Sequence, residues 1–255
     1  MIFDLVPIWS GILALAVFFY VLLDGFDLGV GILYRFAPDR EARNLVMNTI
    51  APIWDGNETW LVLGSIGLLA AFPLAFAIIM PAVYFPILVM LLALVFRGVA
   101  FEFRFRDAEH ATFWDKAFHY GSAVATFAQG IVLGAFIQGF KVDGRAFTGG
   151  AFDCFTPFSL FTGLALMCGY TLLGACWLIL KTEGALLEKA RRWARHAFLA
   201  TFAAVGIVSV WTPFIDADIA RRWFSMPNIL FLSPVPLATA LVGFLWWRAV
   251  AKRQE

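Results

Sequence analysis

Hydrophobic residues along this chain gather in long runs, separated by short segments that contain most of the charged residues. A run of about 20 apolar residues is long enough to cross the hydrocarbon core of a membrane as a helix. Seven such runs lie near 6–33, 58–79, 81–101, 117–140, 157–180, 196–215 and 229–248. Two of the runs begin with a proline, at Pro81 and Pro157, which suits the first turn of a helix.

The composition of the chain also indicates a membrane protein. Apolar residues make up 62% of the 255 residues and charged residues only 15%, a balance far outside that of soluble globular proteins. The links between the runs are too short for a separate soluble domain. We therefore expect an all-α polytopic membrane protein whose chemistry lies in or at the membrane. The first run is longer than the apolar core of a signal peptide and lacks a basic start, so we expect it to be retained.

The basic residues are distributed unequally between alternate links. Of the 19 lysines and arginines, 15 follow the first, third, fifth and seventh runs. The other links contain only Lys141, Arg145, Arg221 and Arg222. The positive-inside rule then predicts a periplasmic N-terminus and a multi-pass protein of the bacterial inner membrane. Because topology accounts for the basic residues, we expect no nucleic-acid partner.

Two links combine charged and apolar residues. The patterns of 35–57 and 181–196 each predict a short helix that lies at the membrane surface. Each link follows the first span of one half of the chain. Residues 1–140 can therefore be divided from 141–255 as two bundles, of four and three spans, although no residue-level repeat relates them.

Two acids lie deep in the first span. Asp24 and Asp27 are three residues apart and so share one helix face. Asp24 is about 16 Å from the expected cytoplasmic end of its helix at 1.5 Å per residue. An ionisable group at that depth needs water, a partner or a shared proton and indicates function. The glycines of the same stretch predict either close helix packing or a loosened helix that admits water; they are Gly25, Gly29 and Gly31.

A second acidic pair begins the second span, in the stretch WDGNETW. Asp55 and Glu58 repeat the spacing of three at the expected cytoplasmic face. One interpretation is helix capping, in which Asp55 or Asn57 accepts hydrogen bonds from free backbone N–H groups. The alternative is a polar site that Trp54 and its neighbour Trp60 fix at the membrane surface.

The third span ends in FRGVAFEFR, which contains Arg97 and Glu102. Arg97 has no carboxylate three or four residues away, so we expect it to pair with an acid of another span or with a lipid head group. In the alternative, Arg97 has no acidic partner, and its long side chain extends so that the guanidinium reaches the membrane surface. With the two acidic pairs, Arg97 and Glu102 form a polar set on the expected cytoplasmic side, which suits proton uptake.

Three histidines bear on cofactor binding. His110, His119 and His196 all lie in links or at span ends, whereas a bis-histidine haem needs a pair on facing helices. We therefore expect this chain to bind no haem by itself. The spacing of its histidines and cysteines also predicts no metal site.

Three stretches together resemble subunit II of the cytochrome bd-type quinol oxidases, and the cyanide-insensitive branch most of all. They are DGFDLGVG at 24–31, IAPIWDGNETWLV at 50–62 and FRGVAFEFR at 96–104. The resemblance is specific over about the first 105 residues and rests mainly on hydropathy beyond them. It implies a chain without haem that packs against a haem-bearing subunit I in a respiratory electron-transport complex. That complex oxidises quinol and reduces O₂ to water, with no activity expected from this chain alone.

The resemblance also implies roles for single residues. Asp55 would mark the cytoplasmic mouth of a proton path, with Glu58 beside it, Glu102 at another family acid, and Asp24 and Asp27 further in. Trp54 and Arg97 match positions that contact a structurally bound quinone in some members. A small accessory subunit and membrane lipids complete the partners that the family implies.

The family pattern has eight spans in two four-helix bundles, whereas seven are found here. We expect a sequence that lacks the last helix of the second bundle rather than a naturally shortened member. Two other functions remain open. One is a proton-coupled secondary transporter, which the lack of deep acids after the fourth span disfavours. The other is a purely structural assembly subunit.

Overall fold

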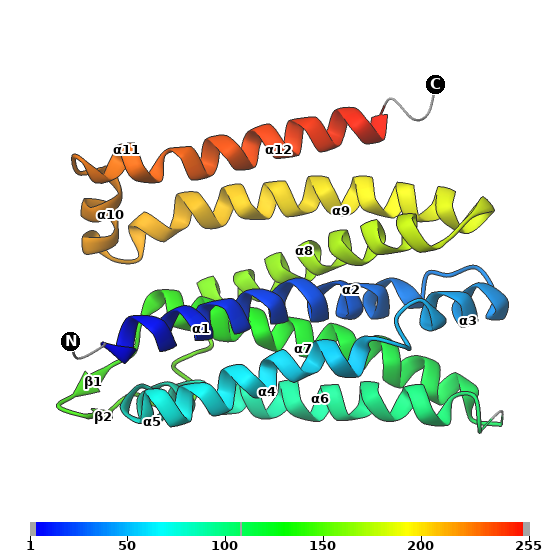
Figure 1. Ribbon diagram of the computed structural model, residues 1–255, viewed down its shortest axis with the longest axis horizontal. Helices are drawn as coiled ribbons and strands as arrows, with labels where there is room; N and C mark the ends of the chain where they lie inside the picture. The colour runs from blue at the N-terminus through cyan, green and yellow to red at the C-terminus, as the bar shows by residue number, and fades with distance from the viewer. Residues whose placement is uncertain (1–3, 108, 252–255) are drawn as a thin grey trace.

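The computed structural model describes residues 4–107 and 109–251 and consists almost wholly of helices (Figure 1). The first half contains α1 (Leu5–Phe19), the π-helical η1 (Tyr20–Asp24), α2 (Gly25–Tyr34), α3 (Arg40–Asn48), α4 (Trp54–Ala71), α5 (Pro73–Ala82), α6 (Tyr84–Phe103) and α7 (Ala111–Gln138). A hairpin of β1 (Val142–Asp143) and β2 (Ala146–Phe147) follows. The second half contains α8 (Pro157–Lys181), α9 (Gly184–Trp211), the 3₁₀ turn η2 (Thr212–Phe214), α10 (Ala217–Phe224), α11 (Asn228–Leu232) and α12 (Pro234–Ala251).

Within the described residues, 6 helical segments are long and apolar enough to cross a membrane. They are Leu5–Tyr34, Tyr84–Phe103, Ala111–Gln138, Pro157–Lys181, Gly184–Phe214 and Asn228–Ala249. The remaining expected span, 58–79, corresponds to α4 and α5, which are separated by a break at Phe72. The all-α polytopic class is therefore confirmed, while the count of seven spans stays a prediction.

The two prolines expected to open spans behave differently. Pro157 is the first residue of α8, where Thr156 caps the helix by accepting a hydrogen bond from the Ser159 amide. The expectation for Pro81 is wrong, because Pro81 lies inside α5 and the next helix begins only at Tyr84. Pro81 has no N–H to donate to the preceding turn of α5, and the helix ends one residue later.

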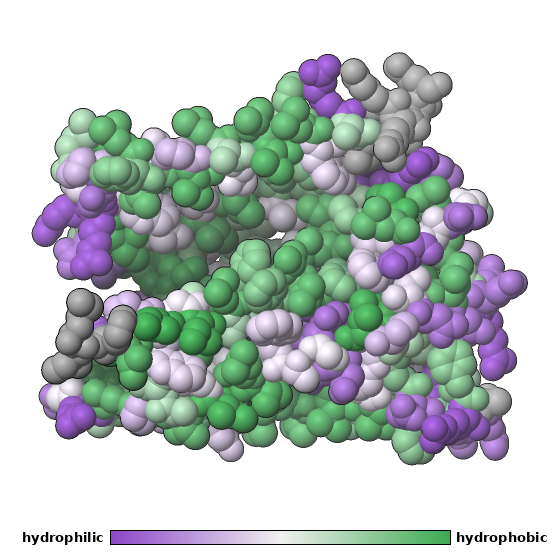
Figure 2. Space-filling model, in the orientation of Figure 1, coloured by the Kyte–Doolittle hydropathy of each residue, from purple (hydrophilic) through white to green (hydrophobic). Residues whose placement is uncertain are grey.

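The links after the long helices alternate between two ends of the bundle (Figure 1). One end carries α3 and the starts of α4, α7 and α9, and is called the α3 end here; the opposite end carries β1, β2 and α10. Hydrophilic residues gather at the two ends, and hydrophobic residues dominate the surface between them (Figure 2). The counted Lys252 and Arg253 lie outside the described residues.

The two predicted surface helices have different outcomes. The link 35–57 contains a separate amphipathic helix, α3, capped by Asp39, as expected. The prediction for 181–196 is wrong, because this segment is the first part of α9 and continues without a break into the membrane span. Charged residues on the first turns of a long helix produce the same pattern as a separate surface helix, so the sequence does not distinguish them.

Glycines set the distance between α2 and α8. A Cβ atom on Gly29 would overlap the carbonyl oxygen of Tyr170, and one on Gly174 would overlap the backbone of Gly29. The two backbones can approach this closely only because neither residue has a side chain. The predicted small-residue face is therefore a packing surface. It fixes the helix segment that contains both deep acids against α8.

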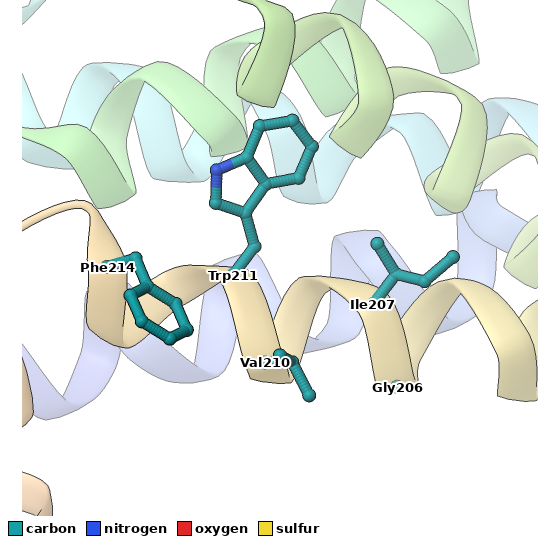
Figure 3. A pocket seen from close by; sticks show the side chains of 5 residues that line it. All are labelled: Gly206, Ile207, Val210, Trp211 and Phe214. Carbon is teal, nitrogen blue, oxygen red and sulfur yellow. The ribbon is translucent and has the colours of Figure 1, made fainter.

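The last helices form the outer part of the fold (Figure 1). Trp246 of α12 stacks on Phe198 of α9, with ring centroids 4.5 Å apart. An apolar cavity of about 580 Å³ lies on α9 and is lined by Gly206, Ile207, Val210, Trp211 and Phe214 (Figure 3). Trp211 points from α9 toward α8, where it packs on Phe158 (Figure 3). The described residues that line it include no ionisable side chain.

Candidate functional site

The two deep acids lie where the N-terminal helix changes its winding. Asp24 closes the π-helical segment η1, and Asp27 lies in the first turn of α2. Both residues are fully buried, at 0% exposure. Single π-helical turns inside α-helices are frequent at functional sites because the wider turn redirects side chains. Here the local winding and the packing of Gly29 against α8 place both carboxylates in the interior.

Arg97 of α6 provides the positive charge for this region. Its guanidinium lies 3.8 Å from an oxygen of Asp24 and 3.9 Å from an oxygen of Glu58. Arg97 is itself 0% exposed and packs 5.6 Å from the ring centroid of Phe101. Taking a charge out of water is costly unless an opposite charge is close. The expectation that Arg97 pairs with an acid of another span is therefore confirmed, and the surface alternative is wrong.

Asn57 connects the second acidic pair to the first. Its side-chain amide donates a hydrogen bond of 2.7 Å to Asp27. The capping interpretation is wrong, because α4 begins at Trp54 and no side chain caps it. In the sequence Asn57 is only a polar residue near a helix start, because the sequence does not show that α4 lies beside α1 and η1 with this side chain turned inward.

The acids expected on the proton path lie at different depths. Glu58 is partly exposed, with 26% of its side chain accessible, and faces Arg97. Asp55 is exposed one turn earlier on α4. Glu102 lies apart from this group, since its side chain is 61% exposed and pairs with Arg106 at 3.2 Å. The structure thus brings together Asp24, Asp27, Asn57, Glu58 and Arg97, called the buried cluster below, but not Glu102.

Three further polar side chains extend this region into the protein, and no clear pattern in the sequence predicts them. Tyr20 lies beside Asp24 and accepts a hydrogen bond from Gln129 of α7. Tyr170 of α8 is 2% exposed, and its hydroxyl has no hydrogen-bond partner among the described residues. Tyrosine is common in apolar spans, so its hydroxyl becomes informative only when the neighbouring helices are known.

A separate polar network lies at the α3 end, and it too was missed. Asp115 of α7 accepts hydrogen bonds from Tyr34 at 2.5 Å, Arg104 at 2.5 Å and Arg43 at 3.1 Å. Arg104 also donates to Asn44 at 2.7 Å. These bonds join α2, α3, α6 and α7. Asp115 precedes the expected span 117–140 by two residues, and an acid just outside a span is typical of a solvated link.

Trp54 and Arg97 were the candidates for contact with a quinone. The ring of Trp54 stacks on Phe101 at 4.8 Å and 4° between the planes. Arg97 lies beneath both rings, 5.9 Å from the centroid of Trp54, with its side chain inaccessible. Trp54 is partly exposed and Arg97 is buried behind it. The quinone contact of these two residues stays a prediction.

The histidines lie in three separate places. His110 contacts Asp107, His119 contacts the carbonyl of Gly31, and His196 contacts the carbonyl of Arg192. Among the described residues, no group of three or more histidine, cysteine or acidic side chains could bind a metal ion. The prediction that haem belongs to a partner chain stays a prediction.

Fold and site together define the class: a multi-pass membrane protein in which four helical segments surround a buried cluster of acids and one guanidinium. A family model described as cytochrome bd terminal oxidase subunit II matches residues 5–255. The chain belongs to this family, and it is a multi-pass protein of the bacterial inner membrane.

Individual relatives agree with the family model. Cytochrome bd-I ubiquinol oxidase subunit 2 of Escherichia coli is 32% identical over 223 residues, which cover 84% of this chain and 59% of the relative. Cytochrome bd ubiquinol oxidase subunit 2 of Bacillus subtilis is 32% identical over 203 residues, covering 78% and 60%. A probable cytochrome oxidase subunit 2 of Haemophilus influenzae is 30% identical over 94% of this chain and 65% of its own length. The chain thus spans about three fifths of the relatives it matches.

Proposed function

We propose that this chain is the non-haem subunit II of a membrane quinol:O₂ oxidase, in which it supports a haem-bearing subunit I and provides a proton-uptake path. Seven membrane crossings, a periplasmic N-terminus and a division into bundles at residue 140 belong to this proposal. The links with most basic residues, which gather at the α3 end, would then face the cytoplasm.

The buried cluster is the observation that carries the proposal. Three carboxyl groups, those of Asp24, Asp27 and Glu58, surround the single positive charge of Arg97. If all three were ionised, the cluster would carry a net charge of −2 inside a medium of low polarity. Charge balance requires two protons for neutrality, because like charges this close cannot all be ionised at low cost. A cluster of this kind can accept and release protons.

The exposure of the acids indicates the direction in which protons would move. Asp55 is exposed, Glu58 is partly exposed, and Asp24 and Asp27 are fully buried. Protons would enter at Asp55 and Glu58 and reach Asp24 inside, with Tyr20 and Gln129 beyond it. Reduction of O₂ to water in the partner subunit would consume them. Glu102 lies outside this sequence of groups, and its part in proton uptake remains a hypothesis from the resemblance alone.

The test changes acids to their neutral amides in the complex purified from its native membrane. We expect Asp24→Asn and Glu58→Gln to lower quinol oxidase turnover by at least about tenfold, with the haem content per complex unchanged. Glu188→Gln, an exposed acid at the same end of the bundle, is the matched control and should leave turnover unchanged.

The other outcomes separate the alternatives. Loss of haem in proportion to turnover would favour a purely structural subunit. Unchanged turnover in the combined variant of Asp24, Asp27 and Glu58 would refute the proton path. A chain that purifies without a haem-bearing partner and drives solute-dependent proton flux in vesicles would be a transporter and not an oxidase subunit.

A further inference from the structure

Two cavities with shared lining residues lie at and below the α3 end. The first has a volume of about 240 Å³ and is lined by polar side chains that include Arg35, Arg43, Asp115 and Lys116. The second has a volume of about 460 Å³ and is an apolar groove between α6 and α7. Lys116 and Tyr120 line both cavities. Polar space at the bundle end therefore adjoins an apolar groove between α6 and α7.

The polar cavity has an excess of positive charge. Asp115 is paired with Arg43 at 3.1 Å and with Arg104 at 2.5 Å, so its charge is already balanced. Arg35 and Lys116 are exposed, and within the described part of the chain neither forms an ion pair. Arg35 instead donates a hydrogen bond of 2.6 Å to the hydroxyl of Tyr120. Two cations and a hydroxyl thus face a cavity that is several times larger than the roughly 30 Å³ of one water molecule.

The groove continues from this cavity along the helices. Its walls include Leu92 and Phe96 of α6, which are both 53% exposed, and Phe113 of α7, which is 54% exposed. Lys116 lines both the cavity and the groove, and a lysine side chain combines a charged end with an aliphatic stem. A ligand that fits both parts must be amphipathic, with an anionic head and a long apolar chain.

We propose that the two cavities together bind one phospholipid with an anionic headgroup. Arg35 and Lys116 contact its phosphate, Tyr120 lies at the junction, and one acyl chain lies in the groove along Leu92 and Phe96. Basic pockets between membrane helices on the cytoplasmic side commonly recognise such headgroups. The orientation expected from the basic links places this cavity on that side. The inference does not depend on the proposed oxidase function.

Native mass spectrometry can test the site on the chain purified with whatever subunits accompany it. The probes are dioleoyl phosphatidylglycerol, which is anionic, and dioleoyl phosphatidylcholine, which is not. We expect the wild type to retain more phosphatidylglycerol, and the variant Arg35→Gln/Lys116→Gln to lose retention by roughly tenfold. The variant Lys181→Gln/Lys189→Gln removes the same charge from the same end of the bundle and should retain the lipid.

A second pair of variants tests the groove without changing any charge. Leu92→Trp fills the groove and should reduce retention of phosphatidylglycerol, whereas Leu91→Trp, on the exposed surface beside it, should not. Equal retention by all variants would overturn the proposal. Displacement of the lipid by inorganic phosphate alone would reduce the site to an anion site. A photo-crosslink from position 92 to another protein chain would show that a subunit occupies the groove instead, and would also overturn the proposal.

Discussion

The guanidinium of Arg97 lies 3.8 Å from the carboxylate of Asp24, and both side chains are fully buried. Asp24 belongs to the first span and Arg97 to α6, so this ion pair joins two helices that are distant in the sequence. Each charge depends on the other, because a buried charge without a partner is strongly unfavourable.

Removal of the cation should therefore destabilise the protein strongly. We expect Arg97→Leu to lower the free energy of unfolding by roughly 3–5 kcal/mol, since it leaves buried carboxylates without a counter-charge. The thermal midpoint of the purified protein measures this loss. Arg106→Gln breaks an exposed pair and should change stability by less than about 0.5 kcal/mol. Adding Asp24→Asn to Arg97→Leu should restore part of the loss, and strictly additive losses would contradict the pairing.

The hydrogen bond from Asn57 to Asp27 predicts a smaller effect. Asn57→Leu should cost about 1–3 kcal/mol, because it removes the amide that satisfies one oxygen of a buried acid. Asn228→Leu, at an exposed position near the opposite end, serves as the control. Denaturant unfolding of both variants measures the difference. If the two variants had equal stability, the contact between Asn57 and Asp27 would contribute nothing.

Gly29 allows a prediction about packing. Gly29→Ala should destabilise the protein by roughly 1–3 kcal/mol, because its methyl group would overlap the Tyr170 carbonyl and push α2 away from α8. Gly64→Ala is the matched control, since nothing lies within 4 Å of a Cβ at this helical position. That substitution should stabilise the protein slightly, by about 0.4–1 kcal/mol. Thermal unfolding should therefore move in opposite directions for the two variants.

The loop between α6 and α7 should show a pH-dependent contribution to stability. Hydrogen bonds from His110 and Trp114 hold the pKa of Asp107 below its ordinary value of 3.8. A depressed pKa means that the ionised carboxylate stabilises the folded state fully above the ordinary pKa and that this contribution disappears as the pH falls through the folded-state value. Asp107→Asn should therefore lower the thermal midpoint at pH 7, and the gap to wild type should narrow as the pH falls below the ordinary pKa of 3.8. A gap of constant size would show that the charge of Asp107 is not involved.

The tertiary structure changed the interpretation of single residues more than the interpretation of class. Asn57 and Asp115 illustrate the reason. As sequence, Asn57 is a polar residue near a helix start and Asp115 is an acid in a link, and both patterns occur at solvated positions. Their hydrogen bonds to Asp27 and to Tyr34 cross between helices that are far apart in the chain. Hydropathy measures how apolar a segment is, and it contains no information on which face meets which neighbour.

The sequence by itself determined the all-α membrane class, most of the long helices, the unequal distribution of basic residues between the links, and the resemblance to the family that the chain was then found to belong to. These features follow from the cost of leaving backbone and charged groups in hydrocarbon, which each segment meets separately. Only the tertiary structure decided that Arg97 pairs with Asp24 and Glu58, that Asp27 is bound by Asn57, and that Glu102 lies apart. Pairing of buried charges depends on distances of a few ångströms between helices, and those distances arise from packing at residues such as Gly29 and Gly174.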